Sequence, residues 1–286
     1  MEQRIIDLYD DFTHGGISRR ELLDRLAQVG GGAAAATALL AAMQNDYALA
    51  AVVDENDPRL ATETAGYVVA GVRMSGYLAR LKGSAKRPAV LVIHENRGLN
   101  PHIKDVARRM AVEGFLTFAV DALSEAGGTP EDEDKAREMI GALDRTVTVQ
   151  RIAAAVPFLA GHAESNGKVG AVGFCWGGAM TNRVAAAGTG LAAAVPYYGS
   201  TLPAEEVPKI GCPLLLQYAG QDERINSGIP AFEAALKQHG KSYELYLYDG
   251  AQHAFNNDTN PARYNKAAAD LAWGRTITFL KKQLGG

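Results

Sequence analysis

The sequence predicts an α/β fold in which a mostly parallel sheet is covered by helices on both faces, preceded by an N-terminal helical extension. From about residue 66 onward, apolar strands alternate with helical runs, which is typical of strands joined by crossover helices. Strands such as 115–120 and 191–195 are continuous apolar runs, as expected when both faces of a strand are buried. The first 60 residues lack this alternation, so we divide the chain into 1–60 and a main domain, 61–286.

The composition indicates one substantial core and excludes several kinds of partner. The chain has 286 residues, of which 47% are hydrophobic, enough for a single α/β domain with an extension. The net charge is −3 and Lys and Arg form no stripe, so neither nucleic acid nor a membrane is an expected partner. Cys175 and Cys212 lie in different predicted elements, which argues against a disulfide framework and favours a reducing compartment, the cytoplasm. Cys212 enters an apolar strand and is expected to pack in the core.

Helical runs are predicted between the strands at 102–113, 133–143, 147–162, 176–187, 229–239 and 262–284. The segment 124–134 contains adjacent glycines and ends in four acidic residues. Such a composition is typical of a surface loop. We expect this loop to lie over the mouth of a site at the sheet edge.

Cys175 lies in the most informative motif of the chain, Gly173-Phe174-Cys175-Trp176-Gly177-Gly178. This motif has the Gly-x-nucleophile-x-Gly form of a sharp turn between a strand and a helix. The short strand 168–174 precedes it and the Ala-rich run 176–187 follows, so Cys175 would lie at a helix N-terminus, where the dipole and free N–H groups favour a thiolate. Taken alone, the motif is equally compatible with a structural cysteine in a Gly-rich turn.

Two candidate partners of the cysteine follow it in the chain, each just past a strand. The apolar strand 213–219 leads into Asp222, and the alternating strand 243–248 is followed by His253. The carboxyl ends of parallel strands share one edge of the sheet, so these residues should converge there. The order nucleophile, acid, histidine is that of a catalytic triad, in which His253 would move the proton and Asp222 would orient the imidazole. Each residue alone is compatible with a role in a turn.

A tetrahedral oxyanion needs two N–H donors. Trp176, directly after the nucleophile, is one candidate. The second donor should come from the loop after an earlier strand, and residues 87–94 form such a strand. We assign the second donor to Asn96, in the loop that follows.

These motifs together resemble the dienelactone hydrolase family, the cysteine branch of the α/β-hydrolases, over roughly residue 66 to the C-terminus. The matching segments are 94–100 (His-Glu-Asn-Arg-Gly-Leu-Asn), 173–178, 196–199 (Pro-Tyr-Tyr-Gly), 220–222 and 253–255. The resemblance implies an α/β-hydrolase fold and a carboxymethylenebutenolidase-type esterase or lactonase that forms a cysteinyl thioester without a cofactor or metal. It also implies that Glu95 contacts the cysteine and controls when the thiolate forms, because a nearby carboxylate opposes ionisation of a thiol.

The sequence departs from this family where dienelactone-cleaving members hold the substrate carboxylate with arginines. The corresponding neighbourhoods are 122–125 (Ala-Leu-Ser-Glu) and 255–257 (Phe-Asn-Asn), and neither contains an arginine. Arg97 and Arg224 are the nearest alternative cations, although Arg224 is also compatible with a plain surface charge. We therefore expect a small-molecule ester or lactone that is neutral or held differently, with dienelactone as the family default.

The remaining tyrosines and histidines receive simpler interpretations. Tyr197 and Tyr198 end a strand at the same sheet edge, and we expect one, Tyr198, to line the pocket and the other to pack in the core. His94 is expected in the core. Four further histidines show no metal-ligand spacing and are expected at solvated positions: His14, His102, His162 and His239.

The first 60 residues allow two interpretations. Residues 18–23 (Ser-Arg-Arg-Glu-Leu-Leu) resemble a twin-arginine export motif, followed by the weakly apolar run 29–43 and a candidate cleavage site at 48–50, which would give a periplasmic or exported protein. Alternatively, 3–13 and 18–29 have amphipathic spacing, and Ser18 with Glu21 forms a capping box. Acidic residues around the arginine pair and the shortness of the apolar run favour this helical arm. It would pack on the main domain or on a second subunit, giving a homodimer.

Two other functions use the same features. A thiol redox or peroxide-sensing protein would use Cys175, but the chain has no Cys-x-x-Cys pair. A catalytically silent interaction module on the same fold would not require Asp222 and His253 in the order of a triad. The order of these three residues therefore favours the hydrolase.

Overall fold

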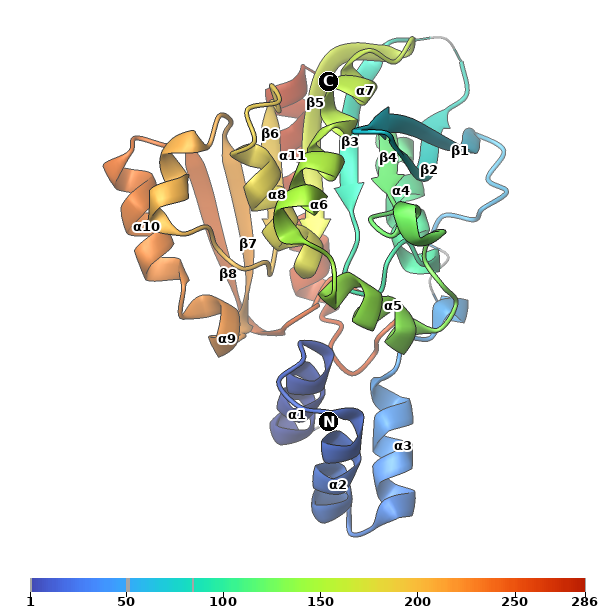
Figure 1. Cartoon of the computed structure of the whole chain (residues 1–286), viewed down its shortest axis with the longest axis vertical. Coiled ribbons are helices and arrows are strands. Elements are labelled where there is room, and N and C mark those ends of the chain that lie inside the picture. Colours follow the sequence, from blue (N-terminus) through green and yellow to red (C-terminus); the bar gives the residue numbers. More distant parts are fainter. Residues whose placement is uncertain (1, 50–51, 84, 286) are drawn as a thin grey trace.

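The computed structural model describes residues 2–49, 52–83 and 85–285. An eight-stranded sheet with the order β1-β2-β4-β3-β5-β6-β7-β8 forms the centre of the main domain, and helices cover both of its faces (Figure 1). Three N-terminal helices form a separate group below the carboxyl edge of the sheet (Figure 1). The predicted α/β architecture with a helical extension is confirmed.

The sheet is parallel except at one end. Its strands are β1 (Leu60–Val69), β2 (Val72–Leu81), β3 (Arg87–Ile93), β4 (Leu116–Val120), β5 (Ser165–Phe174), β6 (Ala193–Tyr197), β7 (Leu214–Gln221) and β8 (Tyr243–Gln252). Strand β2 pairs antiparallel with β1 and β4, whereas the pairs from β4 through β8 are parallel. The alternation predicted from residue 66 starts within β1, so the sheet begins six residues earlier, at Leu60. Ala70 and Gly71, both with positive φ, form the two-residue hairpin turn between β1 and β2.

The helices of the main domain agree closely with the predicted runs. They are α4 (Pro101–Val112), α5 (Glu133–Gly141), α6 (Arg145–Ala153), α7 (Ala155–Ala160), α8 (Trp176–Ala185), α9 (Glu223–Asn226), α10 (Ile229–Gln238) and α11 (Lys266–Leu284). The run predicted over 147–162 is divided into α6 and α7, because Pro157 has no N–H to continue the helix. The last helix begins at Lys266 rather than 262, because Asn265 caps it by accepting from Ala268 N–H.

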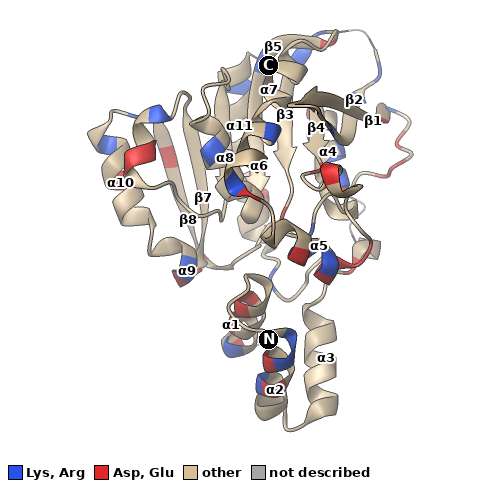
Figure 2. Ribbon diagram, in the orientation of Figure 1, with Lys and Arg blue, Asp and Glu red and all other residues tan. Residues whose placement is uncertain are grey.

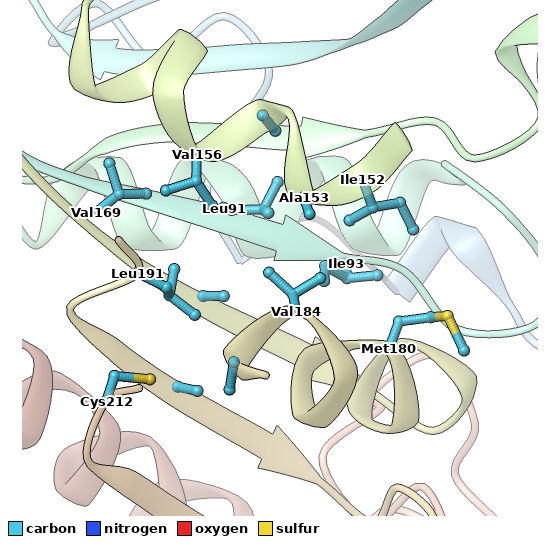
Figure 3. Packing of buried hydrophobic residues seen from close by; sticks show 14 of the residues in the cluster. Leu91, Ile93, Ile152, Ala153, Val156, Val169, Met180, Val184, Leu191 and Cys212 are labelled. Carbon is cyan, nitrogen blue, oxygen red and sulfur yellow. The ribbon is translucent and has the colours of Figure 1, made fainter. Parts of the chain in front are cut away.

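Strand β3 is the centre of the core, and all seven of its residues are buried. Leu91 and Ile93 pack on one face of the sheet with residues of α6, α7 and α8 (Figure 3). Val90 and Val92 pack on the other face with α4 and α11. Burial on both faces explains why the strand reads as a continuous apolar run.

The N-terminal arm, residues 2–43, consists of α1 (Gln3–Thr13), α2 (Arg19–Gly30) and α3 (Ala33–Met43). The predicted capping box is present, since Ser18 Oγ accepts from Glu21 N–H at 3.2 Å and Glu21 accepts from Ser18 N–H at 3.0 Å. The apolar run 29–43 of the alternative export signal forms the end of α2 and α3. Of its candidate cleavage site, 48–50, Ala50 lies outside the described residues.

The arm packs on the main domain of the same chain, and a homodimer through the arm stays a prediction. Among the described residues no single helix is long and apolar enough to cross a bilayer; α2 and α3 would suffice only together, and they are bent by 112°. The arm has its own apolar cluster, to which Ala262 alone among the described main-domain residues contributes. The two parts therefore meet mainly through polar contacts.

Candidate active site

Cys175 occupies the sharp turn that the sequence predicts between β5 and α8. Its φ of 55° and ψ of −115° are rare for a residue other than glycine. A Cβ on Gly177 would lie 2.3 Å from the Ile93 carbonyl oxygen, and one on Gly173 would lie 2.1 Å from the Gly177 carbonyl oxygen. Both positions therefore require glycine, because α8 packs directly against β3 and β5.

The structure brings Asp222 and His253 together beside this turn. The Asp222 carboxylate Oδ2 lies 2.6 Å from His253 Nδ1, and both residues are buried. A ring nitrogen of His253 lies within 4.8 Å of Cys175 Sγ. The carboxylate, the imidazole and the sulfur therefore lie together, with His253 Nε2 free of a hydrogen-bond partner among the described residues.

The charge balance favours a protonated His253. Burial alone lowers the pKa of this histidine, but the negative sulfur of Cys175 and the Asp222 carboxylate outweigh it and raise the pKa to about 10. The surroundings of His253 therefore favour its charged, imidazolium form.

Trp176 and Asn96, the expected oxyanion donors, both line a cavity that contains Cys175. Trp176 is the first residue of α8, where an N–H group has no acceptor within the helix. The side chain of Asn96 donates to the Thr13 carbonyl at 2.7 Å, so its loop is attached to the arm. His94 is fully buried as expected, and its ring stacks on Trp176 with centroids 5.3 Å apart.

Glu95 and Tyr198 lie on the buried side of the site. Glu95 Oε2 accepts from Asn257 Nδ2 at 2.8 Å, while Glu95 Oε1 and the Tyr198 hydroxyl have no hydrogen-bond partner among the described residues. Burial, followed by the charges of Glu95 and Cys175, raises the pKa of Tyr198 well above its ordinary value. Tyr198 lies edge-on to His253 with ring centroids 5.1 Å apart. Tyr197 instead packs in the core, its hydroxyl 2.6 Å from Thr276 Oγ1.

The two arginines that the sequence offers as substrate cations differ in availability. Arg97 is buried and pairs with Glu133 at 2.9 Å, and it also donates to the Tyr9 hydroxyl at 3.0 Å. Its charge is therefore already neutralised within the protein. Arg224 lines the main cavity and donates to His14 Nε2 at 3.1 Å.

Sequence reasoning missed Arg263. It is buried beside the small cavity that Glu95 and Cys175 also line, and it pairs with Asp10 of the arm at 2.8 Å. No motif marks Arg263 in the sequence. Its place in the site depends on how the chain after His253 folds back and on where the arm docks.

The main cavity beside Cys175 has a volume of about 370 Å³ and a positive lining. Its charged side chains other than histidine are Glu138 and four arginines: Arg137, Arg145, Arg183 and Arg224. Figure 2 shows the basic positions on α6 and α8. Burial, and then the charge of Arg145, lower the pKa of Arg183. Arg183 also lies 3.6 Å from Glu206, and Arg137 lies 3.7 Å from Asp134. An anionic group in the cavity would add a partner for Arg145 and Arg224, which have no ion pair among the described residues.

The segment 124–134 was expected over the cavity mouth, and this is wrong. It lies beside the arm, where Asp134 pairs with Arg19. Helix α5, which follows it, contributes Glu138 and Ile140 to the cavity lining. Asp134 therefore holds the arm, whereas Glu125 and Glu133 pair with Arg151 and Arg97 of the main domain.

His14 was expected at a solvated position, and the structure places it in the site. Its Nε2 lies 3.4 Å from Cys175 Sγ, and its ring is edge-on to His253 with centroids 4.8 Å apart. Nothing in the sequence near His14 signals this, because the contact depends on how the arm docks. His102 is also fully buried, with its ring 3.2 Å from Asp258.

His14, Cys175 and His253 have donor atoms within 4.8 Å of one another, and this group could in principle hold a metal ion. Each histidine has its Nδ1 in a hydrogen bond, to Asp10 O and Asp222 Oδ2 respectively, as in many metal-ligating histidines. However, Arg224 donates to the same Nε2 of His14, and its charge opposes a cation. The donor set therefore fits a metal poorly.

Comparison with known proteins agrees with this geometry. Residues 74–284 match the model of the dienelactone hydrolase family, and residues 1–32 match a separate family described as YqhI-like. A protein of Escherichia coli K12 provisionally named carboxymethylenebutenolidase is 33% identical over 232 residues, covering 76% of this chain and 84% of its own. A protein of Bradyrhizobium provisionally named 2-oxo-3-(5-oxofuran-2-ylidene)propanoate lactonase is 33% identical over 229 residues, covering 73% and 90%.

Solved structures give the same result. The structure named m3DLH has a TM-score of 0.71 at 23% identity and covers 79% of this chain and 99% of its own. A structure from Klebsiella pneumoniae, provisionally named a dienelactone hydrolase, has a TM-score of 0.66 at 25% identity and covers 77% and 98%. The chain therefore belongs to the dienelactone hydrolase family of α/β-hydrolases and is a hydrolase of carboxylic esters or lactones.

Proposed function

We propose that this protein cleaves its small-molecule ester or lactone through a cysteinyl thioester, with Cys175, His253 and Asp222 as the triad. The observation that carries this proposal is the 2.6 Å contact between Asp222 and His253 beside the strained turn of Cys175. The sulfur of Cys175 forms a bond to the acyl carbon, and the leaving alkoxide takes a proton from His253. Water then attacks the thioester, giving its proton to His253, which returns it to the sulfur.

The neighbouring groups have supporting roles in the same proposal. The N–H groups of Trp176 and Asn96 stabilise the oxyanion of each tetrahedral intermediate. Glu95 lines a small cavity with Cys175, and its carboxylate opposes the thiolate until substrate arrives. Tyr198 holds the edge of the His253 ring and closes the buried side.

We further propose a substrate with an anionic group, held differently from the family pattern. Four arginines and a single carboxylate line the main cavity, which supports an anionic ligand. The name of the Bradyrhizobium relative is that of a propanoate lactone, which has such a group. Of the two options left open by the missing arginines, we therefore favour a differently held anion over a neutral substrate.

The docking of the arm also bears on location. The arm contacts the site through Asn96 and Cys175, which supports its retention in the working protein. Both cysteines are free, and a nucleophilic thiol is preserved best where the surroundings are reducing. We propose a cytoplasmic protein that retains its arm.

Replacing the nucleophile tests the chemistry. We expect Cys175→Ala to lower aryl-ester turnover by at least about 10³-fold, since no thioester can form. Intact-mass spectrometry during turnover should detect an acyl adduct on the wild-type protein and none on the variant. Cys212→Ala, which alters a buried thiol two residues before β7, is the matched control and should retain both turnover and adduct. Turnover that survives Cys175→Ala would exclude the proposal.

The raised pKa of His253 predicts a pH-dependent stability difference between wild type and Asp222→Asn. The pKa is about 10 in the folded protein against an ordinary value of 6.5. The protonated ring therefore stabilises the fold fully below pH 6.5, and this contribution is lost as the pH rises toward 10. Asparagine keeps the cap on α9 but removes the charge. In urea unfolding, the difference in free energy should shrink from pH 6.5 to 10; a constant difference would contradict it.

The arginine-lined cavity predicts a selective effect of Arg183→Met. We expect the KM for an aryl ester with a terminal carboxylate to rise about tenfold, because a charged hydrogen bond is lost. The KM for the matching neutral ester should not change. Arg59→Met, at an exposed residue paired with Asp57, is the control. An equal change for both esters would refute an anion site at Arg183.

Retention of the arm has a direct test. N-terminal sequencing of the protein from its native cell should give a start within the first few residues of the sequence. A mature chain that starts near Ala51 would instead support export with cleavage.

A further inference from the structure

The arm docks on the main domain through arginines that surround the site. Arg263 pairs with Asp10 at 2.8 Å and lies over the Tyr9 ring at 5.1 Å. Arg137 lies over the Phe12 ring at 4.3 Å and donates to the Phe12 carbonyl at 3.2 Å. These contacts fix the C-terminal turn of α1 against the site.

His14 is the tip of this docked helix. Its Nδ1 donates to the Asp10 carbonyl at 2.7 Å, so its Nε2 is an acceptor, to which Arg224 donates at 3.1 Å. Cys175 Sγ lies 3.4 Å from the same nitrogen. Burial, then the charges of His253 and Arg224, hold the pKa of His14 well below its usual range, and the ring is neutral. Gly15, with a φ of 82°, then turns the chain away.

Thr13 and His14 separate the space around Cys175 into two parts. Both residues line the main cavity of about 370 Å³ and also a second cavity of about 10 Å³, which contains Glu95 and Arg263. The second cavity has room for about one water molecule and none for an acyl group. With the arm docked, only the arginine-lined side of Cys175 is open to a substrate.

We propose that His14 is a specificity-determining residue that covers one side of Cys175 and confines the acyl group of the substrate to the arginine-lined cavity. This proposal rests on the proposed hydrolase function. The main domain alone would present Cys175 to both cavities. The arm therefore forms one wall of the active site, and the side chain at position 14 decides which acyl groups fit.

Two esters that differ only in acyl size test the confinement. We compare aryl acetate with an aryl ester of a branched, bulky acid, using wild type, His14→Ala and His14→Phe. In His14→Ala, the kcat/KM for the bulky ester divided by that for the acetate should rise about tenfold. The smaller side chain no longer excludes the bulky acyl group by steric contact. His14→Phe keeps the wall and should leave the ratio near that of wild type. His239→Ala, at an exposed histidine, is the matched control and should change neither value.

Alkylation by iodoacetamide tests the cover on Cys175 without relying on ester turnover. The rate of modification at Cys175, followed by intact mass, should rise at least about threefold in His14→Ala, because access to the thiol increases. Asp10→Asn, which breaks the pair with Arg263, should act in the same direction by loosening the arm.

The outcomes separate the two proposals. A faster alkylation in His14→Ala supports the cover even if wild type cleaves neither ester, in which case the hydrolase proposal alone fails. Unchanged alkylation and an unchanged acyl ratio would overturn the role of His14. A uniform loss of turnover for both esters, with slower alkylation, would also overturn it, because His14 would then activate the thiol.

Discussion

The close packing of α8 against β3 at Cys175 is the constraint on which the rest of the site depends. A side chain at Gly177 would overlap the carbonyl oxygens of Ile93 and His94, so the helix can approach only with glycine there. This approach places Cys175 at a helix N-terminus and at the carboxyl edge of the sheet together. Asn96, Asp222 and His253 follow strands that end at the same edge, and they therefore converge on the sulfur.

Charge is divided around this centre. The buried side holds carboxylates, with Glu95 bonded to Asn257 and Asp222 bonded to His253. The open side holds four arginines, of which Arg183 pairs with Glu206 and Arg137 with Asp134. In the proposed mechanism, His253 stabilises a thiolate between them, and a substrate anion is attracted from the open side. On this proposal, the separation allows one small site to hold a reactive anion and still recruit a charged substrate.

The parts of the site that the sequence predicts are those fixed by local chain geometry. The glycines around Cys175, and the positions of Asp222 and His253 just past their strands, follow from the rules for turns and parallel sheets. His14 and Arg263 could not be found in this way. His14 lies 161 positions from the cysteine that it contacts, and its placement depends on docking between two units with separate cores.

Docking of this kind links the arm to the chemistry through charge. The arm shares little apolar surface with the main domain, so the ion pair of Asp10 with the buried Arg263 is a principal attachment. Removal of Asp10 would leave a buried guanidinium without its partner, which is unfavourable, beside the small cavity that Glu95 and Cys175 line. The docked arm thus neutralises a cation next to the nucleophile and closes that side. Arg145 and Arg224 are then the cavity arginines without an ion pair among the described residues, and they remain available to a substrate.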